Sequence, residues 1–436
     1  MKVLIIADNV SMRMGGEASL PFYYFKLFRT QGIDTYCICH ARVKNEIQQA
    51  FSPEDYARFT FVEDTFLQVK VYSLIKGLPG RLSFVFGQWI YFSTMSRARS
   101  VAQTTIMQKN IQLVFEPAPI TPKGVSFTYG LGVPVVIGPL CGGLEFPSAF
   151  TQMDSLFIRL TFQLAQKFSE ICHRIVPGKI QADVIVVANQ RTEDALPAGI
   201  RGKVYHVVES GVDLNIWKPD PQLQRKDNQE IRFVYAGRFV DWKGIKFLVE
   251  AFVRIASQTS AVLDLIGDGE LRASIEAQVK EAKIENQVRF HGWMSREESS
   301  QLIRQCDVFV MPSLRECGGT AILEAMAIGL PTIVTNWCGP AQYVTHDCGF
   351  LVEPSSHEAF VAGLADAMIK LASSPDLRQR MGIAGQKRVK TDYFDWDSKA
   401  NRMLEIFAEV IRERESLPTP ILESIVADPE PSTGVN

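Results

Sequence analysis

The stretch RECGGTAILEAMAIGLP, residues Arg315 to Pro331, decides the fold of the second half of this chain. A short apolar run, DVFVMPS, precedes it, and the strong helix formers LEAMA follow the glycines. The pattern predicts a strand, a tight turn at Gly318 and Gly319, and a helix that begins near Gly319. Glycine lets backbone N–H groups approach a ligand closely, and the N-terminus of a helix favours a phosphate.

Two carboxylates flank this turn. Glu316 lies on the expected loop, and Glu324 lies about 7 Å along the expected helix at the usual rise per residue. Such a pair can hold two polyols at opposite ends of a bound anion, which is the shape of a nucleotide-sugar. The plain alternative is an ordinary strand–turn–helix with two solvated glutamates. The glycines, the helix formers and the following Gly-Leu-Pro together favour the binding site.

The rest of the chain repeats the strand–helix alternation. Short β-branched runs that end in Gly, Pro or Asn are typical of buried parallel strands. The expected strands are Val3–Ala7, Thr35–Cys39, Leu113–Phe115, Val133–Ile137 and Val184–Val187, then Phe233–Tyr235, Val262–Ile266, Val288–Phe290, Val308–Met311 and Thr332–Thr335. The fold class is therefore α/β, with doubly wound sheets.

A length of 436 residues fits two domains rather than one core. Residues 1–210 form the first expected domain and residues 211–400 the second, with a polar, proline-containing linker near residues 210–228. A helix is expected over residues 401–415. The tail, residues 416–436, is rich in Pro, Ser and acidic residues, a composition typical of disorder.

The composition narrows the function. The formal net charge of −2 gives no sign of a nucleic-acid binder. The eight cysteines are scattered, and Cys39-His40 has no second pair to complete a metal site. The N-terminal MKVLIIAD is too short an apolar run for a signal peptide, and no stretch reaches the length of a membrane span. A cytoplasmic location is expected.

Loops after other expected strands add charge and glycine in the second half. In YAGRFVDWKG, Arg238 and Lys243 share a loop with two glycines and could neutralise a diphosphate, although a solvated basic loop would look the same. Gly267 in LIGDGE could admit a base or ribose. The backbone from Gly292 to Met294 could line a nucleobase pocket, whereas His291 is not favoured as a catalytic base.

The first half offers two more glycine loops. Gly15 and Gly16 follow the first strand and precede a helix that starts near Glu17, an arrangement that suits a phosphate. In IGPLCGGLEFP, Gly142 and Gly143 follow another strand, and Glu145 is a candidate contact to an acceptor. Ligands bind beyond the carboxyl ends of parallel strands, so both loops should face the cleft.

These residues resemble the retaining glycosyltransferases of family four, which have the GT-B fold. The likeness spans about residues 2–403 and is strongest over residues 183–354. It rests on the following motifs: Glu316 and Glu324 with seven residues between them; Gly237, Arg238, Lys243 and Gly244; the pair Gly15 and Gly16; and the phrases ANQRTEDALP, ESGVD and CGPAQYV…GFLVEP.

The resemblance implies two Rossmann-like domains facing a central cleft and hexosyl transfer with retention at the anomeric carbon. It implies that Glu316 contacts the sugar, that Glu324 holds the ribose, and that backbone N–H groups near Gly319 and Thr320 assist. Arg238 and Lys243 would bind the diphosphate in place of a metal ion, and no cofactor is expected. The donor would be a UDP- or GDP-sugar, and the acceptor a saccharide, a lipid-linked sugar or a small molecule in polysaccharide assembly.

One position departs from the family pattern. Many members place a histidine near the reacting sugar after a central strand of the first domain. Here LVFEPAPITPKG has Phe115 at that position, with Glu116 beside it as a candidate substitute in the acceptor or sugar pocket. Two rival functions stay open. One is a nucleotide-sugar epimerase or hydrolase on the same architecture, which would want a carboxylate or histidine near the anomeric carbon, and the sequence shows no clear candidate. The other is a nucleotide-sugar-binding protein without transfer activity, which the missing histidine permits.

Membrane contact is a further expectation. Residues 70–99 mix Lys and Arg with Tyr, Phe and Trp, and SLFIRLTFQLAQKF at residues 155–168 is a second amphipathic candidate. Helices that face the core are the ordinary explanation of both patterns. A lipid-linked acceptor would make peripheral attachment to the inner face of the membrane useful.

Overall fold

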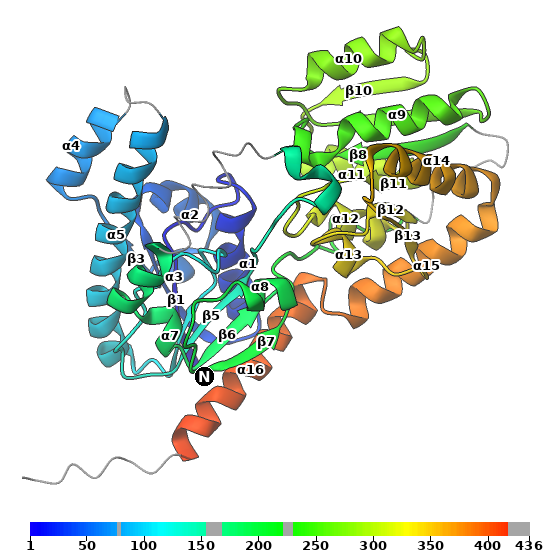
Figure 1. The fold of residues 1–436 in the computed structure, drawn as a ribbon. Helices are drawn as coiled ribbons and strands as arrows, with labels where there is room; N and C mark the ends of the chain where they lie inside the picture. Colours follow the sequence, from blue (N-terminus) through cyan, green and yellow to red (C-terminus); the bar gives the residue numbers. More distant parts are fainter. Residues whose placement is uncertain (76–79, 154–167, 221–229, 417–436) are drawn as a thin grey trace, which may run out of the picture.

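The computed structural model describes residues 1–75, 80–153, 168–220 and 230–416, which form two α/β domains joined side by side (Figure 1). The segment at residues 155–168, apart from Phe168, and the expected disordered tail beyond Ser416 lie outside the described residues. Among the helices that are described, none is long and apolar enough to cross a bilayer.

Each domain is built on a parallel sheet. In the first, the strand order is β3 (Phe59–Val62), β2 (Asp34–His40), β1 (Lys2–Ile6), β4 (Leu113–Glu116), β5 (Val135–Leu140), β6 (Val184–Val187) and β7 (Lys203–His206). In the second, the order is β10 (Val288–Gly292), β9 (Ala261–Ile266), β8 (Ile231–Ala236), β11 (Val308–Met311), β12 (Thr332–Thr335) and β13 (Gly349–Val352).

Helices cover both faces of each sheet. Those of the first half are α1 (Gly16–Thr30), η1 (Ala41–Val43), α2 (Lys44–Ala50), α3 (Pro53–Tyr56), α4 (Phe66–Ile75), α5 (Gly80–Lys109), η2 (Ser148–Met153), α7 (Gly178–Gln181) and α8 (Gln190–Asp194). Those of the second half are η3 (Asp241–Lys243), α9 (Ile245–Ala256), α10 (Arg272–Glu281), α11 (Arg296–Arg304), α12 (Thr320–Ile328), α13 (Pro340–Tyr343), α14 (His357–Ser373), α15 (Pro375–Thr391) and α16 (Trp396–Ser416).

The central strands are apolar on both sides because each side meets a helix layer. Along β1, Val3 and Ile5 pack into the cluster that contains α1, whereas Leu4 and Ile6 pack into the cluster that contains α5. A strand that is buried on both faces shows no alternation of polar and apolar residues. The near-continuous apolar runs in the sequence are explained by this double burial, and every strand expected from them is present.

The order of the strands reverses once in each sheet. In the first sheet the chain winds one way from β1 and the other way from β4, and in the second it does so at β8 and β11. Loops after adjacent strands that wind in opposite directions leave a crevice at the carboxyl end of the sheet. These two crevices are where the site is found.

The last helix belongs to the first domain, although it follows the second in sequence. The expected helix at residues 401–415 begins earlier, at Trp396, and it packs along α1 (Figure 1). Phe407 lies between Phe28 and Phe115, with ring centroids 5.7 and 5.0 Å away. The chain therefore crosses between the domains twice, and the two crossings pair where Val212 and Trp396 exchange backbone hydrogen bonds with each other's segments.

We predict that Phe407→Ala destabilises the first domain by about 3–5 kcal/mol, because it empties a fully buried site among aromatic rings. Chemical denaturation followed by circular dichroism measures the loss. The matched control is Glu415→Ala, an exposed change on the same helix, which should stay within about 0.5 kcal/mol of the parent. Equal stability of the two variants would contradict the packing of α16 on this domain.

Candidate active site

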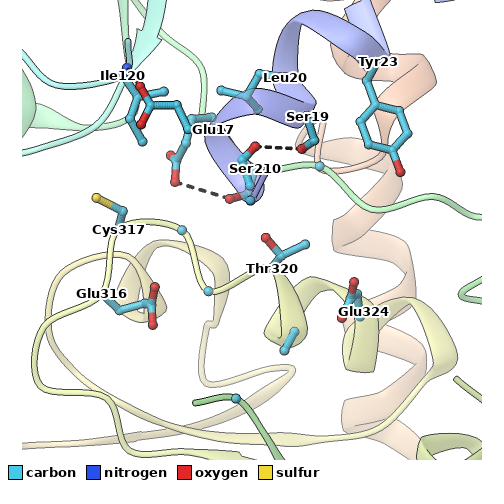
Figure 2. Close-up of a pocket in the computed structure, with 18 of the residues that line it drawn as sticks. Glu17, Ser19, Leu20, Tyr23, Ile120, Ser210, Glu316, Cys317, Thr320 and Glu324 are labelled. Carbon is cyan, nitrogen blue, oxygen red and sulfur yellow. Dashed lines mark hydrogen bonds between the residues drawn. The ribbon is translucent and has the colours of Figure 1, made fainter. Parts of the chain in front are cut away.

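A cavity of about 530 Å³ lies between the two crevices. Its lining comes from the loops after β1 and β4 in the first domain, after β8 and β11 in the second, and from the crossing at Glu209, Ser210 and Gly211. Figure 2 shows Glu316, Thr320 and Glu324 on one wall, with Glu17 and Ser19 on the facing wall. The sequence-predicted residues that line it are Glu316, Glu324, Lys243, Gly318, Gly319, Thr320, Gly15 and Gly16.

The glycine turn before α12 is shaped by close approach. Gly319 caps the helix in the left-handed region at φ 66°, where other residues are strained. A β-carbon added to Gly318 would lie 2.0 Å from the hydroxyl of Ser210, so the turn must be bare for the crossing to pass. Gly318 and Gly319 therefore place no side chain of their own over the backbone N–H groups at the start of α12.

The lysine of the second domain contacts the loop carboxylate directly. Lys243 ends the short helix η3, and its ammonium forms an ion pair with Glu316. Gly244 fixes this geometry at φ 71°, because a β-carbon there would lie 2.0 Å from the carbonyl oxygen of Pro312. The ion pair holds both side chains at the cavity wall, where an entering anion would compete with Glu316 for the ammonium.

The second carboxylate is held by an arginine that the sequence reading missed. Arg296 lies 3.8 Å from Glu324 and donates a hydrogen bond to Tyr23 of the first domain. Tyr23 in turn stacks on Trp396 with ring centroids 4.4 Å apart. Burial raises the pKa of Glu324 to about 7, and Arg296 opposes that rise.

A visible sequence signal could have located Arg296. Ser295 and Glu298 form a capping box, with each side chain bonded to the other's backbone N–H. This S-x-x-E pattern begins a helix just beyond β10, so Arg296 stands at the carboxyl end of the sheet. Tyr23 and Trp396 gave no such signal, since both read as core aromatics.

The first domain contributes a glycine start and a carboxylate. Gly15 adopts φ 101° and precedes α1, while Gly16 begins that helix. The carboxylate of Glu17 accepts a hydrogen bond of 3.0 Å from the backbone N–H of Ile120, which joins the loops after β1 and β4. This hydrogen bond links the two loops at the point where the strand order of the first sheet reverses.

Four expected donor-side positions do not line the cavity. The side chain of Arg238 is exposed, although its neighbour Gly237 does line the wall. Gly267 donates a backbone hydrogen bond of 2.7 Å to Gly292, so these two glycines hold β9 and β10 together where the strands end. Met294 packs against an apolar cluster.

Glu116 requires a correction, because the structure buries it away from the cavity. It accepts hydrogen bonds from Ser126 and from Thr128, the latter at 2.6 Å, inside the first domain. Burial raises its pKa, and the nearby Lys179 opposes the rise. Phe115 points to the opposite face of β4, into the core beside Phe407. Neither residue stands in for the family histidine.

The loop after β5 serves a different purpose from the one expected. Gly142, Gly143 and Glu145 are absent from the cavity lining. The carbonyl oxygen of Glu145 instead accepts a 2.8 Å hydrogen bond from the indole of Trp337, which lies in the second domain. Just beyond, Phe150 packs on Phe247 of α9. This loop ties the domains together.

Within the described part of the chain, no group of three or more His, Cys, Asp or Glu residues could hold a metal ion. His291 lies 2.7 Å from the fully buried Asp264, and His40 lies 3.1 Å from Asp64. Both histidines therefore have contacts with single carboxylates rather than with a ligand set.

Comparison with known proteins agrees with this geometry. Residues 218–388 match the family model described as Glycosyl transferases group 1. The second domain of this chain is therefore similar to the group 1 glycosyltransferases. Over 246 residues it is 29% identical to N-acetyl-alpha-D-glucosaminyl L-malate synthase of Bacillus anthracis, covering 54% of this chain and 62% of the relative.

Two other matches extend the comparison. The lipopolysaccharide core biosynthesis glycosyltransferase LpsD of Rhizobium meliloti is 28% identical over 201 residues, covering 45% of this chain and 56% of that one. Anabaena Alr3699/HepE, solved in complex with UDP, superposes with a TM-score of 0.62 at 17% identity, covering 94% of this chain and all of that chain. The chain has the GT-B fold, and it spans about half to three fifths of the length of the curated relatives it matches.

We predict that Glu324→Gln makes the protein more stable than the parent above pH 7, by up to about 3 kcal/mol. The folded pKa of Glu324 exceeds its unfolded value. The native state therefore binds an extra proton between its unfolded value and about 7, and the stability that this proton supports is lost as pH rises through that range. Denaturation midpoints between pH 5 and 8 measure the difference.

The control for this change is Glu285→Gln, at an exposed position of the same domain. Its stability difference from the parent should not depend on pH over that range. A difference for Glu324→Gln that stays constant from pH 5 to 8 would contradict the raised pKa.

Proposed function

We propose that this protein transfers a glycosyl group from a nucleotide-diphosphate-sugar to an acceptor with retention of the anomeric configuration. One observation carries the proposal: Lys243, Glu316, Glu324 and the glycine turn before α12 converge on one cavity between the two sheet crevices. Cation, bare N–H groups and two carboxylates match the diphosphate, the sugar and the ribose of such a donor.

The proposed roles follow from position. The diphosphate displaces Glu316 from its ion pair with Lys243. The freed carboxylate can then accept hydrogen bonds from the sugar. Lys243 and the N–H groups of α12 then stabilise the charge that grows on the leaving phosphate. Arg238 reaches the same phosphate from the rim when the domains close.

The bond changes balance without a further reactant. The acceptor oxygen attacks the anomeric carbon on the face from which the phosphate leaves. As the new C–O bond forms and the bond to phosphate breaks, the acceptor proton passes to the departing phosphate oxygen.

The donor is proposed to be UDP- or GDP-linked. The HepE complex with UDP supports a nucleoside diphosphate, and LpsD supports a setting in polysaccharide or lipopolysaccharide assembly. A melting-temperature panel of UDP-, GDP- and ADP-sugars identifies the donor, because a ligand that binds the folded chain raises its melting point.

With that donor, we predict that Glu316→Ala lowers turnover by about 100-fold or more, because it removes contacts to the reacting sugar. Release of nucleoside diphosphate, measured with and without acceptor, reports the rate. Transfer needs both substrates, hydrolysis needs the donor alone, and a simple binding protein consumes neither.

The matched control is Glu285→Ala, an exposed glutamate of the second domain, which should keep the parent rate. Parent-like turnover in Glu316→Ala would contradict the catalytic role of Glu316. No melting shift with any sugar nucleotide would overturn the proposed donor class.

Two smaller cavities lie beside the donor cavity in the first domain, and we call these two cavities together the groove. A cavity of about 200 Å³ shares Glu17 with the donor cavity, and one of about 380 Å³ shares Asp8 and Tyr91 with the cavity of about 200 Å³. The side-chain oxygens of Asn9 and Tyr91 have no hydrogen-bond partner among the described residues. Buried polar atoms of this kind suit the hydroxyls of a saccharide acceptor.

The outer end of the groove, the cavity of about 380 Å³, is lined by residues of α4 and α5, which lie at the edge of the first domain (Figure 1). Several large apolar side chains of these two helices are exposed. The exposed members are Phe66, Leu67, Val69, Tyr72, Leu74, Phe86 and Trp89. Aromatic and aliphatic residues beside the cation Lys70 fit the interfacial region of an anionic bilayer. A lipid-linked acceptor would place its lipid here and its sugar in the groove, at the cytoplasmic face.

We predict that the protein sediments with vesicles of phosphatidylcholine and phosphatidylglycerol at low salt, and that the double change Phe66→Ser and Leu67→Ser reduces the bound fraction at least about fivefold. The control is Met107→Ser, an equally exposed apolar residue at the other end of α5. Sedimentation unaffected by the double change, or absent in the parent, would remove the membrane proposal.

A further inference from the structure

Glu209 is a buried carboxylic acid at the donor cavity that the roles described above leave unused. It follows β7 in the first crossing between the domains, and only 4% of its surface is exposed. It lines the cavity together with Ser210 and Gly211. A residue at this point belongs to neither domain alone and faces the loops of both.

The two oxygens of this carboxyl differ in their surroundings. Oε1 accepts a 3.3 Å hydrogen bond from the hydroxyl of Ser210. Oε2 is buried and has no hydrogen-bond partner among the described residues. An unpartnered buried carboxyl oxygen is costly, so an oxygen of this kind beside a cavity points to a ligand that completes it.

The carboxyl lies against the glycine turn before α12. A β-carbon placed on Gly318 would be 2.4 Å from Oε1 of Glu209 and 2.0 Å from the hydroxyl of Ser210. The N–H groups at the start of α12 line the cavity and favour an anion. An anion bound there would therefore meet Glu209 at its edge.

Burial and charge favour the acid form at this position. The pKa of Glu209 is raised first by burial and further by the nearby carboxylate of Glu316. A hydrogen bond from its own backbone N–H, the charge of Lys399 of α16 and the hydroxyl of Ser210 oppose the rise. Lys399 also donates a hydrogen bond of 2.5 Å to the carbonyl of Val208. The other titratable groups that face Glu209 are the buried phenols Tyr24 of α1 and Tyr343 of α13 and the thiol of Cys141.

We propose that Glu209 is a further donor-site residue, which binds in its acid form and donates a hydrogen bond from its carboxyl group to a non-bridging oxygen of the donor diphosphate. The inference rests on the proposed function and deepens it. An ionised Glu209 would add to the repulsion that Glu316 already exerts on an entering diphosphate. A neutral acid removes that repulsion and supplies a hydrogen-bond donor without requiring a side chain to move.

Two variants separate this role from the alternatives. Glutamine keeps an N–H donor and has no titration, whereas alanine keeps neither donor nor acceptor. At pH 6.5 we expect Glu209→Gln to weaken donor binding by about threefold and Glu209→Ala by about 10- to 100-fold, the range for a hydrogen bond to a charged group. Calorimetry of the full chain with UDP-glucose or GDP-mannose, whichever raises the melting temperature more, gives these affinities.

The pH profile tests the proton itself. The pKa of Glu209 is raised, and burial lowers that of Lys399 to about 7. Parent affinity should therefore fall as pH rises through the raised pKa of Glu209, because the acid form is lost. In Glu209→Gln the fall should be much smaller. Lys399 and Glu324 titrate in both proteins, so their effects cancel in the ratio of the two affinities.

Each other outcome decides against the proposal. Equal losses in glutamine and alanine would mean that Glu209 binds as a carboxylate. Parent-like binding in both variants would leave it a packing residue. If alanine prevents folding, the pH profile of the glutamine variant decides alone. A parent that binds no sugar nucleotide would overturn the proposed function, and this inference would fall with it.

Discussion

The reversal of strand order in each sheet is the constraint on which the site depends. Parallel strands need long crossovers, and loops part only where the winding direction changes. In this chain both changes, at β1/β4 and at β8/β11, open towards the same cavity. Residues as far apart as Glu17 and Glu316 meet because topology places their loops there, and the two crossings at Val212 and Trp396 fix how the crevices face each other.

The strength of the sequence signal depended on how many faces of a strand are buried. Central strands such as β6 and β11 were predicted to the residue, because burial on both sides leaves only apolar residues. The strands that were missed, β3, β7 and β13, are edge strands of their sheets. In β7 the end residues Lys203 and His206 are exposed, so the run does not read as a strand.

The site residues that were predicted lie close together in the sequence, and the contacts that were missed join residues far apart in it. The glycine turn, Glu316 and Glu324 belong to one short segment whose chemistry is visible in order, and the structure brings them to the cavity. Glu116 was misplaced because adjacent residues of a strand point to opposite faces. On β4 both faces are interior, and the acid there is satisfied by Ser126 and Thr128. Contacts such as Arg296 with Tyr23 join residues 273 apart and leave no periodic trace.

The balance of charge in the cavity explains why its groups hold one another when no donor is bound. Lys243 is paired with Glu316 and Arg296 with Glu324, so neither cation is left free among these carboxylates. In the proposed function, a diphosphate that binds these cations displaces their carboxylates, and each displaced carboxylate then needs hydroxyl donors. A sugar on one side and a ribose on the other would supply them. A donor with a polyol at each end would therefore fit this arrangement better than a bare diphosphate, which would leave the displaced acids without partners.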